Sequence, residues 1–265
     1  MKKLSSKIYF GLLLLFLYIP IFVLIVYSFN STKSTVWSGF TLDWYRKLFN
    51  NREIMTALLN TIIIAVVSSI IATVLGTTAA IGISKMRRKS RSAVLNVTYI
   101  PIINPEIITG VSLMLFFRIF VDQFNLSFGF STLIIAHITF NVPYVIYSVM
   151  PKLRQMDPHI IEAARDLGCN ERKAFFKVAI PQILPGIMSG FLLALTYSID
   201  DFVVSYFNSG TQVETLPITI NAMIKRKISP EINALSTLIF VVVLIVLLIK
   251  NAYDNKKLRA LKLRK

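Results

Sequence analysis

The chain has 265 residues, of which 55% are hydrophobic and 16% are charged, and its formal net charge is +16. Soluble globular proteins carry about a quarter charged residues, so this chain is too apolar to cover itself with a wettable surface, and we expect it in a lipid bilayer. The basic residues stand in short tracts between apolar blocks, which argues against nucleic acid as a partner. The single cysteine, Cys169, excludes an intramolecular disulfide and a cysteine-based metal site.

Apolar runs of about 17 to 25 residues are long enough for a helix to cross a membrane. We expect an all-α integral membrane protein with a single transmembrane domain over residues 1–265. Its six predicted helices cover residues 8–29, 58–83, 94–120, 131–150, 182–207 and 234–249. A long loop, residues 151–180, joins the fourth helix to the fifth.

Two of these apolar runs, the first and the third, depart from a simple membrane-spanning helix. The first could be a cleaved signal peptide, but it is longer than the usual apolar core of about 7 to 15 residues and lacks a small-residue cleavage site, so we expect a retained helix. The third is interrupted by Pro101, Asn104, Pro105 and Glu106. Broken backbone at membrane depth is tolerated only beside protein or a water-filled pathway, so we expect this stretch to line one of these.

The lysines and arginines predict the orientation. Most of the 29 basic residues fall on one side if the amino terminus is cytoplasmic, in tracts at 2–7, 85–91, 152–177 and 250–265. Basic loops stay in the cytoplasm, so both termini and the loop 151–180 are expected there.

The loop 151–180 predicts a two-helix elbow. Asp157 can cap a helix that has Pro158 at its first position, Gly168 can end it in a left-handed conformation, and Asn170 can begin a second helix reaching Val178. The apolar residues of the first helix share one face: Ile160, Ala163, Ala164 and Leu167. A helix lying on lipid headgroups is the alternative, but small alanines beside Glu162 suit a protein groove better than a membrane surface.

At these residues the chain resembles the permease subunits of bacterial ABC importers. Their cytoplasmic signature is Glu-Ala-Ala, three residues, Gly, nine residues, Ile, one residue, Leu-Pro. Its positions here are Glu162, Ala163, Ala164, Gly168, Val178, Ile180 and Pro181, and Val178 and Ile180 are conservative departures. The resemblance implies a type I importer fold in which the first elbow helix is a coupling helix on a separate ATPase. ATP and Mg²⁺ are then used by that chain, and no cofactor is expected in this one.

Within this family the chain is similar to the spermidine/putrescine permeases. The similarity rests on short segments at residues 18–21, 40–45, 105–110 and 198–203. It implies inward transport of polyamines across the bacterial inner membrane. It also implies a second homologous permease, an ATPase dimer and an extracytoplasmic substrate-binding protein as partners.

Three carboxylates inside the apolar runs point to a cationic substrate: Glu106, Asp200 and Asp201. A charged carboxylate at a helix centre costs about 2.5 to 3.5 kcal/mol on insertion scales, which makes these acids candidates for a substrate pathway. Adjacent helical residues diverge by about 100°, so we expect Asp201 to face the pore, with Asp200 close behind. Structural roles are the alternative: Glu106 could pair with Arg118 or cap backbone freed by Pro105, and Asp200 could mark the outer interface.

Other functions have weaker support. We find no phosphate-binding loop of the G-x-x-x-x-G-K-[ST] type, no metal-ligand cluster and no catalytic serine elbow, so we expect no enzymatic activity, no catalytic residue and no metal site. His137 is expected to be a hydrogen-bonded packing residue. An importer for another small solute, or an ion-coupled secondary transporter that uses the same acids, remains open. Four membrane tyrosines could offer ring faces to ammonium groups or simply pack: Tyr144, Tyr147, Tyr197 and Tyr206.

Overall fold

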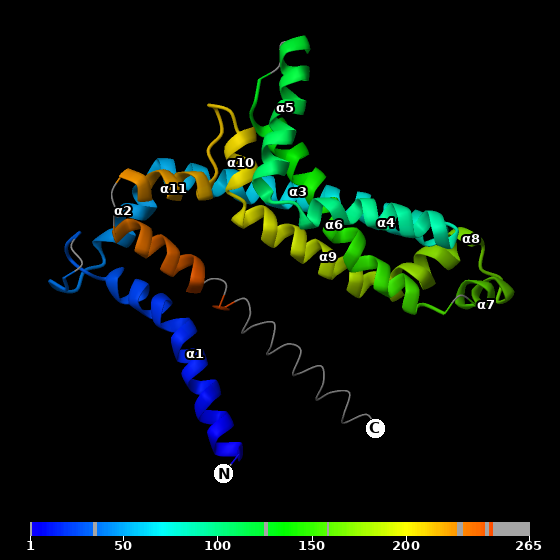
Figure 1. Ribbon diagram of the computed structural model, residues 1–265, viewed down its shortest axis with the longest axis horizontal. Coiled ribbons are helices and arrows are strands. Elements are labelled where there is room, and N and C mark those ends of the chain that lie inside the picture. Colours follow the sequence, from blue (N-terminus) through cyan, green and yellow to red (C-terminus); the bar gives the residue numbers. More distant parts are fainter. Residues whose placement is uncertain are drawn as a thin grey trace. The chain divides into compact units, whose positions relative to one another are not determined.

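The computed structural model describes residues 2–33, 36–124, 127–157, 159–226, 230–241 and 244–245. These residues form helices and their connecting segments, with an antiparallel bridge between Asn30 and Phe40 (Figure 1). The chain divides into two compact units, Met1–Met55 with Ile220–Lys265 and Thr56–Thr219. Each unit is described by itself, although α3 (Arg52–Ser84) and α11 (Leu216–Arg226) contribute residues to both.

The first unit contains α1 (Lys2–Tyr27), α2 (Asp43–Asn50) and an apolar helix over Pro230–Val241. The segment after α1 folds back on itself because the indole N–H of Trp44 donates to the carbonyl of Asn30 at 2.7 Å. The rings of Phe29 and Phe40 stack with their centroids 5.3 Å apart. These contacts hold the amphipathic helix α2 against the end of α1.

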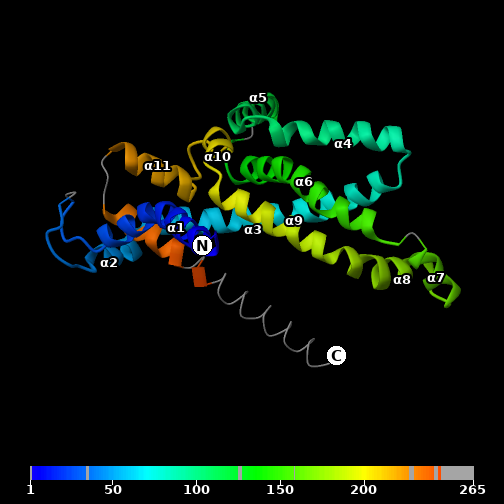
Figure 2. The ribbon, with the colours of Figure 1, turned by 60° about the horizontal axis from the view of Figure 1, so that its bottom comes forward.

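The second unit is built around α6 (Phe130–Gln155) and α9 (Ile180–Asp200), which lie side by side in both ribbon views (Figures 1 and 2). Glycines on α9 allow the close approach. A Cβ on Gly186 would lie 2.9 Å from the carbonyl oxygen of Ser148, and one on Gly190 would lie 3.2 Å from the Cα of Val145. Small residues at helix interfaces are the usual means of close packing in membranes, where lipid removes the hydrophobic driving force between helices.

The remaining helices of the second unit define the regions of functional interest. They are α4 (Arg88–Ile103), α5 (Glu106–Phe124), α7 (Ile160–Asp166), α8 (Glu171–Ala174), a π-helical turn over Phe175–Ala179 and α10 (Val203–Asn208). The buried core between α6 and α9 includes Val145, Val149 and Ile183. Apolar side chains from α3 and α4 complete this core.

The predicted third helix, residues 94–120, is two helices rather than one. The chain bends by 102° between α4 and α5. Pro105 has no N–H to donate and disfavours a helical conformation in the residue before it, so Asn104 adopts an extended backbone with φ −65° and ψ 138°. The interruption expected from the sequence is therefore a sharp corner.

The predicted fifth helix, residues 182–207, is wrong at both ends. It begins earlier, because α8, the π-helical turn and α9 form one continuous helix over Glu171–Asp200. The π-helical turn precedes Pro181, which has no N–H to continue the ordinary helical ladder. It ends earlier, because Asp201 turns to ψ 115° and α10 starts as a separate helix.

Four described helices are long and apolar enough to cross a membrane: Tyr9–Tyr27, Arg52–Ser84, Phe130–Gln155 and Glu171–Asp200. The bent pair α4 and α5 makes a fifth if it counts as one span. The predicted sixth helix, residues 234–249, overlaps the helix Pro230–Val241, and several of its later residues lie outside the described part of the chain. Six spans are therefore a prediction, whereas an all-α protein with several apolar spans is established.

Candidate translocation pocket and coupling elbow

The elbow consists of α7 followed by a turn at Gly168, which leads into α8. Gly168 has φ +84°, a left-handed conformation that glycine adopts without steric cost. Its N–H donates to the carbonyl of Arg165 at 2.9 Å, and the N–H of Cys169 donates to the carbonyl of Ala164 at 3.0 Å. This pair of bonds is a Schellman C-cap. The side chain of Asn170 then caps α8 by accepting from the N–H of Lys173 at 2.8 Å.

The apolar residues of α7 differ in how far they are buried. Ala164 is buried against the rest of the elbow, whereas Ala163 is exposed and Leu167 is 87% exposed. Glu162 is exposed beside them, and its Oε2 accepts from Nδ1 of His159 at 3.0 Å. α7 therefore exposes a carboxylate, a small side chain and a leucine.

Glu162 also sets the electrostatics of this end of the elbow. Its hydrogen bond and negative charge raise the pKa of His159 above its ordinary value, and the charge of Asp157 acts in the same direction. The N–H of His159 donates to Asp157 Oδ1 at 2.9 Å, so the expected capping aspartate does contact the start of α7. Pro158, expected at the first helical position, lies outside the described residues.

The remaining signature residues lie along the helix that leaves the elbow. Val178 is partly buried within the π-helical turn. Ile180 and Pro181 begin α9, and Ile180 packs against the core between α6 and α9. The signature thus spans an exposed helix, a glycine turn and the first turn of a long apolar helix.

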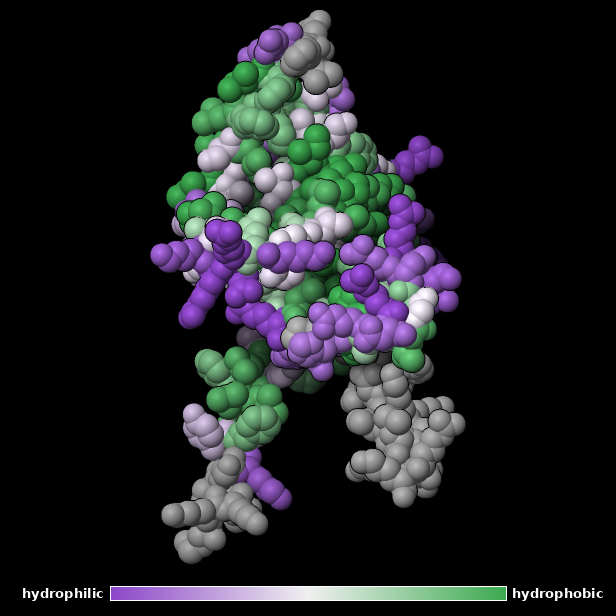
Figure 3. All heavy atoms as spheres, turned by 90° about the vertical axis from the view of Figure 1, so that its right-hand side faces the viewer, coloured by the Kyte–Doolittle hydropathy of each residue, from purple (hydrophilic) through white to green (hydrophobic). Residues whose placement is uncertain are grey.

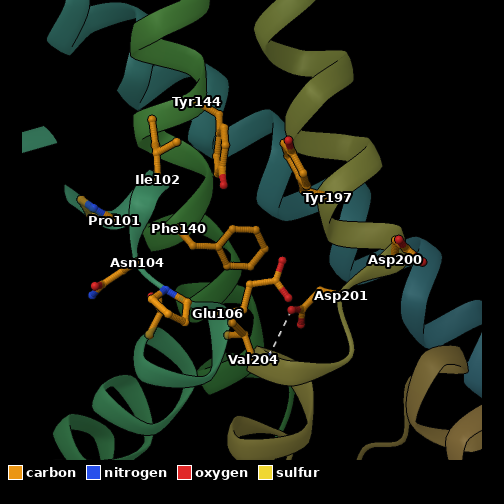
Figure 4. Close-up of a pocket in the computed structure, with 12 residues that line it drawn as sticks. Pro101, Ile102, Asn104, Glu106, Phe140, Tyr144, Tyr197, Asp200, Asp201 and Val204 are labelled. Atoms are coloured by element: carbon orange, nitrogen blue, oxygen red, sulfur yellow. Dashed lines mark hydrogen bonds between the residues drawn. The ribbon is translucent and has the colours of Figure 1, made fainter. Parts of the chain in front are cut away.

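A cavity of about 340 Å³ lies where α4 and α9 end, within the second unit. The carboxylates of Glu106 and Asp201 point toward each other across it, whereas Asp200 lies to one side and turns away (Figure 4). Its upper wall is formed by the rings of Tyr144 and Tyr197, whose centroids are 4.5 Å apart. The residues that line the cavity include no lysine or arginine.

Asp201 is held by the structure around it. It is 9% exposed, and its two carboxylate oxygens accept from the N–H groups of Val204 at 3.1 Å and Ser205 at 2.7 Å, the first of which is dashed in Figure 4. This is N-terminal capping of α10. The Nε2 of His137 lies 3.5 Å from Asp201 Oδ2 and 3.1 Å from the hydroxyl of Ser205. Sequence reasoning placed Asp201 inside a helix and missed this capping role.

Glu106 has a different setting. It is exposed to the cavity in the first turn of α5, where a carboxylate is favoured by the helix dipole. Arg118, considered as its partner from the sequence, instead pairs with Asp122 at 2.9 Å. Unlike that of Asp201, the side chain of Glu106 therefore forms no hydrogen bond or ion pair with the described residues.

Two of the four tyrosines considered from the sequence, Tyr144 and Tyr197, line the pocket. The ring of Tyr147 instead packs at a tilt against Tyr99, and that of Tyr206 packs at a tilt against Phe202. The contribution of Phe140 to the pocket wall was not anticipated, because an apolar aromatic in an apolar run has no distinguishing pattern.

The family model for the binding-protein-dependent transport system inner membrane component matches residues 72–256. The chain belongs to this family. It is 36% identical to the spermidine/putrescine transport system permease protein PotC of Haemophilus influenzae over 91% of this chain and 93% of that one. It is 39% identical to the putrescine transport system permease protein PotI of Escherichia coli K12 over 84% and 81% of the two chains.

The fold of the permease also has counterparts among solved structures. A crystal structure of a bacterial ABC transporter involved in the import of alginate matches with a TM-score of 0.71 at 17% identity, covering 96% of this chain and 94% of that one. A crystal structure of an amino acid ABC transporter matches with a TM-score of 0.51 at 21% identity, over 78% and 98%. The permease is thus a multi-pass membrane protein with the type I ABC importer fold. Every residue discussed in the elbow and the pocket lies within the segment that the family model matches.

Proposed function

We propose that this permease carries polyamines inward through the pocket between Glu106 and Asp201, as one subunit of an ABC importer. The observation that carries the proposal is the combination of two facing carboxylates with two neighbouring tyrosine rings in a cavity whose lining includes no basic side chain. Carboxylates attract ammonium groups, and aromatic faces stabilise them further. The relatives named above as spermidine/putrescine and putrescine permeases support the same cargo.

The volume of the cavity is consistent with a small solute. Small-molecule sites usually occupy about 300 to 1,000 Å³, and 340 Å³ lies at the lower end of that range. Asp200 faces away from the centre of the pocket and serves in the proposal as an outer charge that draws cations toward it. A flexible chain with two or three ammonium groups can contact Glu106 and Asp201 together.

The elbow couples this pocket to ATP hydrolysis in a separate chain. Glu162, Ala163 and Leu167 are exposed on a short helix, and Gly168, Val178, Ile180 and Pro181 connect that helix to α9. α9 ends at the pocket, so a displacement of the elbow reaches the pocket through one continuous helix. In the complete importer an ATPase dimer binds ATP and Mg²⁺ and holds α7. A second homologous permease and an extracytoplasmic binding protein complete the pathway, and both termini are cytoplasmic.

The cargo is tested by uptake of radiolabelled spermidine and putrescine into proteoliposomes that contain the complete importer. Glu106→Gln removes one pocket charge without removing a structural contact, and we expect it to raise KM at least about tenfold, which corresponds to about 1.4 kcal/mol of lost cation binding. Asp122→Asn is the matched control, because Asp122 lies on the same helix and, among the described residues, forms its ion pair with the exposed Arg118. Unchanged uptake by the Glu106→Gln variant would refute the proposal that polyamines bind in this pocket.

The division of labour is tested separately. The chain alone should move no substrate, whereas adding the ATPase and the second permease should restore uptake. Transport by the chain alone, driven by a proton or sodium gradient, would identify an ion-coupled secondary transporter instead. Glu162→Lys should weaken co-purification of the ATPase, and normal assembly with normal uptake in that variant would contradict the coupling role of α7.

A further inference from the structure

A second, open cavity of about 720 Å³ lies between the start of α4 and the end of α6 in the second unit. Three arginines line it, together with a polar and aromatic set that consists of Ser92, Asn96 and Tyr147. The arginines are Arg88 and Arg91 from α4 and Arg154 from α6. This cavity is separate from the pocket that holds Glu106 and Asp201, because the two share no lining residue.

The charge of this cavity is uncompensated. Among the described residues, no carboxylate lies within ion-pair distance of Arg88, Arg91 or Arg154. Arg88 is also the first residue of α4, which begins without a side-chain cap, so the positive end of the helix dipole adds to the three guanidinium groups. Figure 3 shows hydrophilic side chains gathered over the end of the molecule that carries α7 and α8, the end at which α4 starts in Figure 1. Such a site fits an anion, and guanidinium groups bind phosphate oxygens in a bidentate manner.

The same face of α4 becomes apolar one to two turns further along. Residues spaced by three or four share a helix face, so Tyr99 and Ile103 continue the line that begins at Arg88, Ser92 and Asn96. The ring of Tyr99 packs at a tilt against Tyr147 with centroids 5.3 Å apart, and Ile103 is 67% exposed. The hydroxyl of Tyr147 donates to the carbonyl of Leu95 at 2.7 Å, which fixes this aromatic pair at the inner edge of the cavity.

We infer that this cavity binds the phosphate headgroup of an anionic phospholipid, with the acyl chains lying along Tyr99 and Ile103. A charged headgroup site that passes directly into an exposed apolar face matches a phospholipid and has no counterpart in free phosphate or a nucleotide. Basic pockets between transmembrane helices commonly hold anionic headgroups. In the orientation proposed above, the lipid belongs to the cytoplasmic leaflet, beside the coupling elbow.

The test measures binding of phosphatidylglycerol to the full-length chain, in the complex with which it purifies, by native mass spectrometry from phosphatidylcholine mixed micelles. The pocket variant is Arg88→Gln with Arg91→Gln and Arg154→Gln. The matched control is Lys85→Gln with Arg87→Gln and Lys89→Gln, which removes the same charge from adjacent exposed positions that do not line the cavity. Each pocket arginine should contribute about fivefold to affinity, so the pocket variant should lose about 100-fold and the control less than about fivefold.

A second variant guards against loss of folding. Replacing the same three arginines by lysine keeps the charge, and it should retain the fold while losing part of the affinity, because lysine cannot form bidentate phosphate contacts. Equal losses of phosphatidylglycerol affinity in the pocket variant and the control would show that general surface charge causes the effect, and would overturn the proposed lipid site. Millimolar inorganic phosphate that displaces phosphatidylglycerol would overturn the lipid assignment in favour of a free anion. Unchanged lipid binding with loss of the ATPase partner would assign the arginines to a protein contact.

Discussion

Asp201 carries two roles that mutation can separate: it caps α10 and it supplies charge to the pocket. Asp201→Ala leaves the buried N–H groups of Val204 and Ser205 without their acceptor. Loss of an N-cap costs about 1 kcal/mol, and unsatisfied buried donors cost about 1 to 3 kcal/mol, so we expect a destabilisation of about 2 to 3 kcal/mol. At about 2 to 4 °C per kcal/mol for chains of roughly this size, Tm should fall by roughly 5 to 10 °C.

Asp201→Asn should behave differently, because asparagine is also a good capping residue. Its single carbonyl oxygen can satisfy one of the two N–H groups, so we expect a loss of about 1 kcal/mol, or roughly 2 to 4 °C, together with a marked rise in the KM for polyamine. Asp200→Ala is the control for stability, since Asp200 is exposed and turns away from the other pocket residues. Thermal unfolding of the purified chain, followed by intrinsic fluorescence in one detergent, compares the variants. An alanine variant as stable as the parent would refute the capping argument.

Three further predictions concern the packing of α9 and the elbow. Gly186→Leu should sharply reduce the yield of folded protein in size-exclusion chromatography, because its Cβ would lie 2.9 Å from backbone oxygen on α6, whereas Gly82→Leu, with nothing within 4 Å, should not. Gly168→Ala should cost about 1 to 2 kcal/mol in the elbow, since alanine is strained at φ +84°, and it should lower substrate-stimulated ATPase activity without changing the KM for substrate. The contact between His159 and Glu162 raises the pKa of His159, so it should stabilise α7 fully below about pH 6.5, and this stabilisation should be lost as the pH rises through the raised pKa. Hydrogen exchange of the α7 amides should follow the same pH dependence. Glu162→Gln should abolish that pH dependence.

The elbow could be predicted closely because its signals are local. Gly168, Asn170 and Asp157 each act on backbone within a few residues, so their capping roles can be derived from spacing alone. The burial of Ala164 beside an exposed Ala163 depends on how α7 packs against the segment that follows it, and no periodicity encodes that packing. The continuous helix from Glu171 to Asp200 could not be predicted from the sequence either, because a proline such as Pro181 normally marks the start of a helix.

The pocket was harder to predict because its parts come from distant segments. Glu106 and Asp201 were identified as charges in apolar runs, but their facing arrangement depends on two breaks in the backbone. One break, at Pro105, has an evident cause in the sequence. The other follows Asp200, where neither proline nor glycine marks it, and it is stabilised by bonds that Asp201 makes to α10. His137 gave no sign of its contact with Asp201, because the two residues are far apart in the sequence.

The two breaks have a further electrostatic consequence. α4 and α9 end at the cavity, and α5 and α10 begin there, so two helix carboxyl ends and two helix amino ends meet at it. A carboxyl end carries roughly half a unit of negative charge and an amino end roughly half a unit of positive charge, so the four ends largely cancel. The preference for cations therefore rests on the two acidic side chains, and a variant with both acids neutralised should lose it.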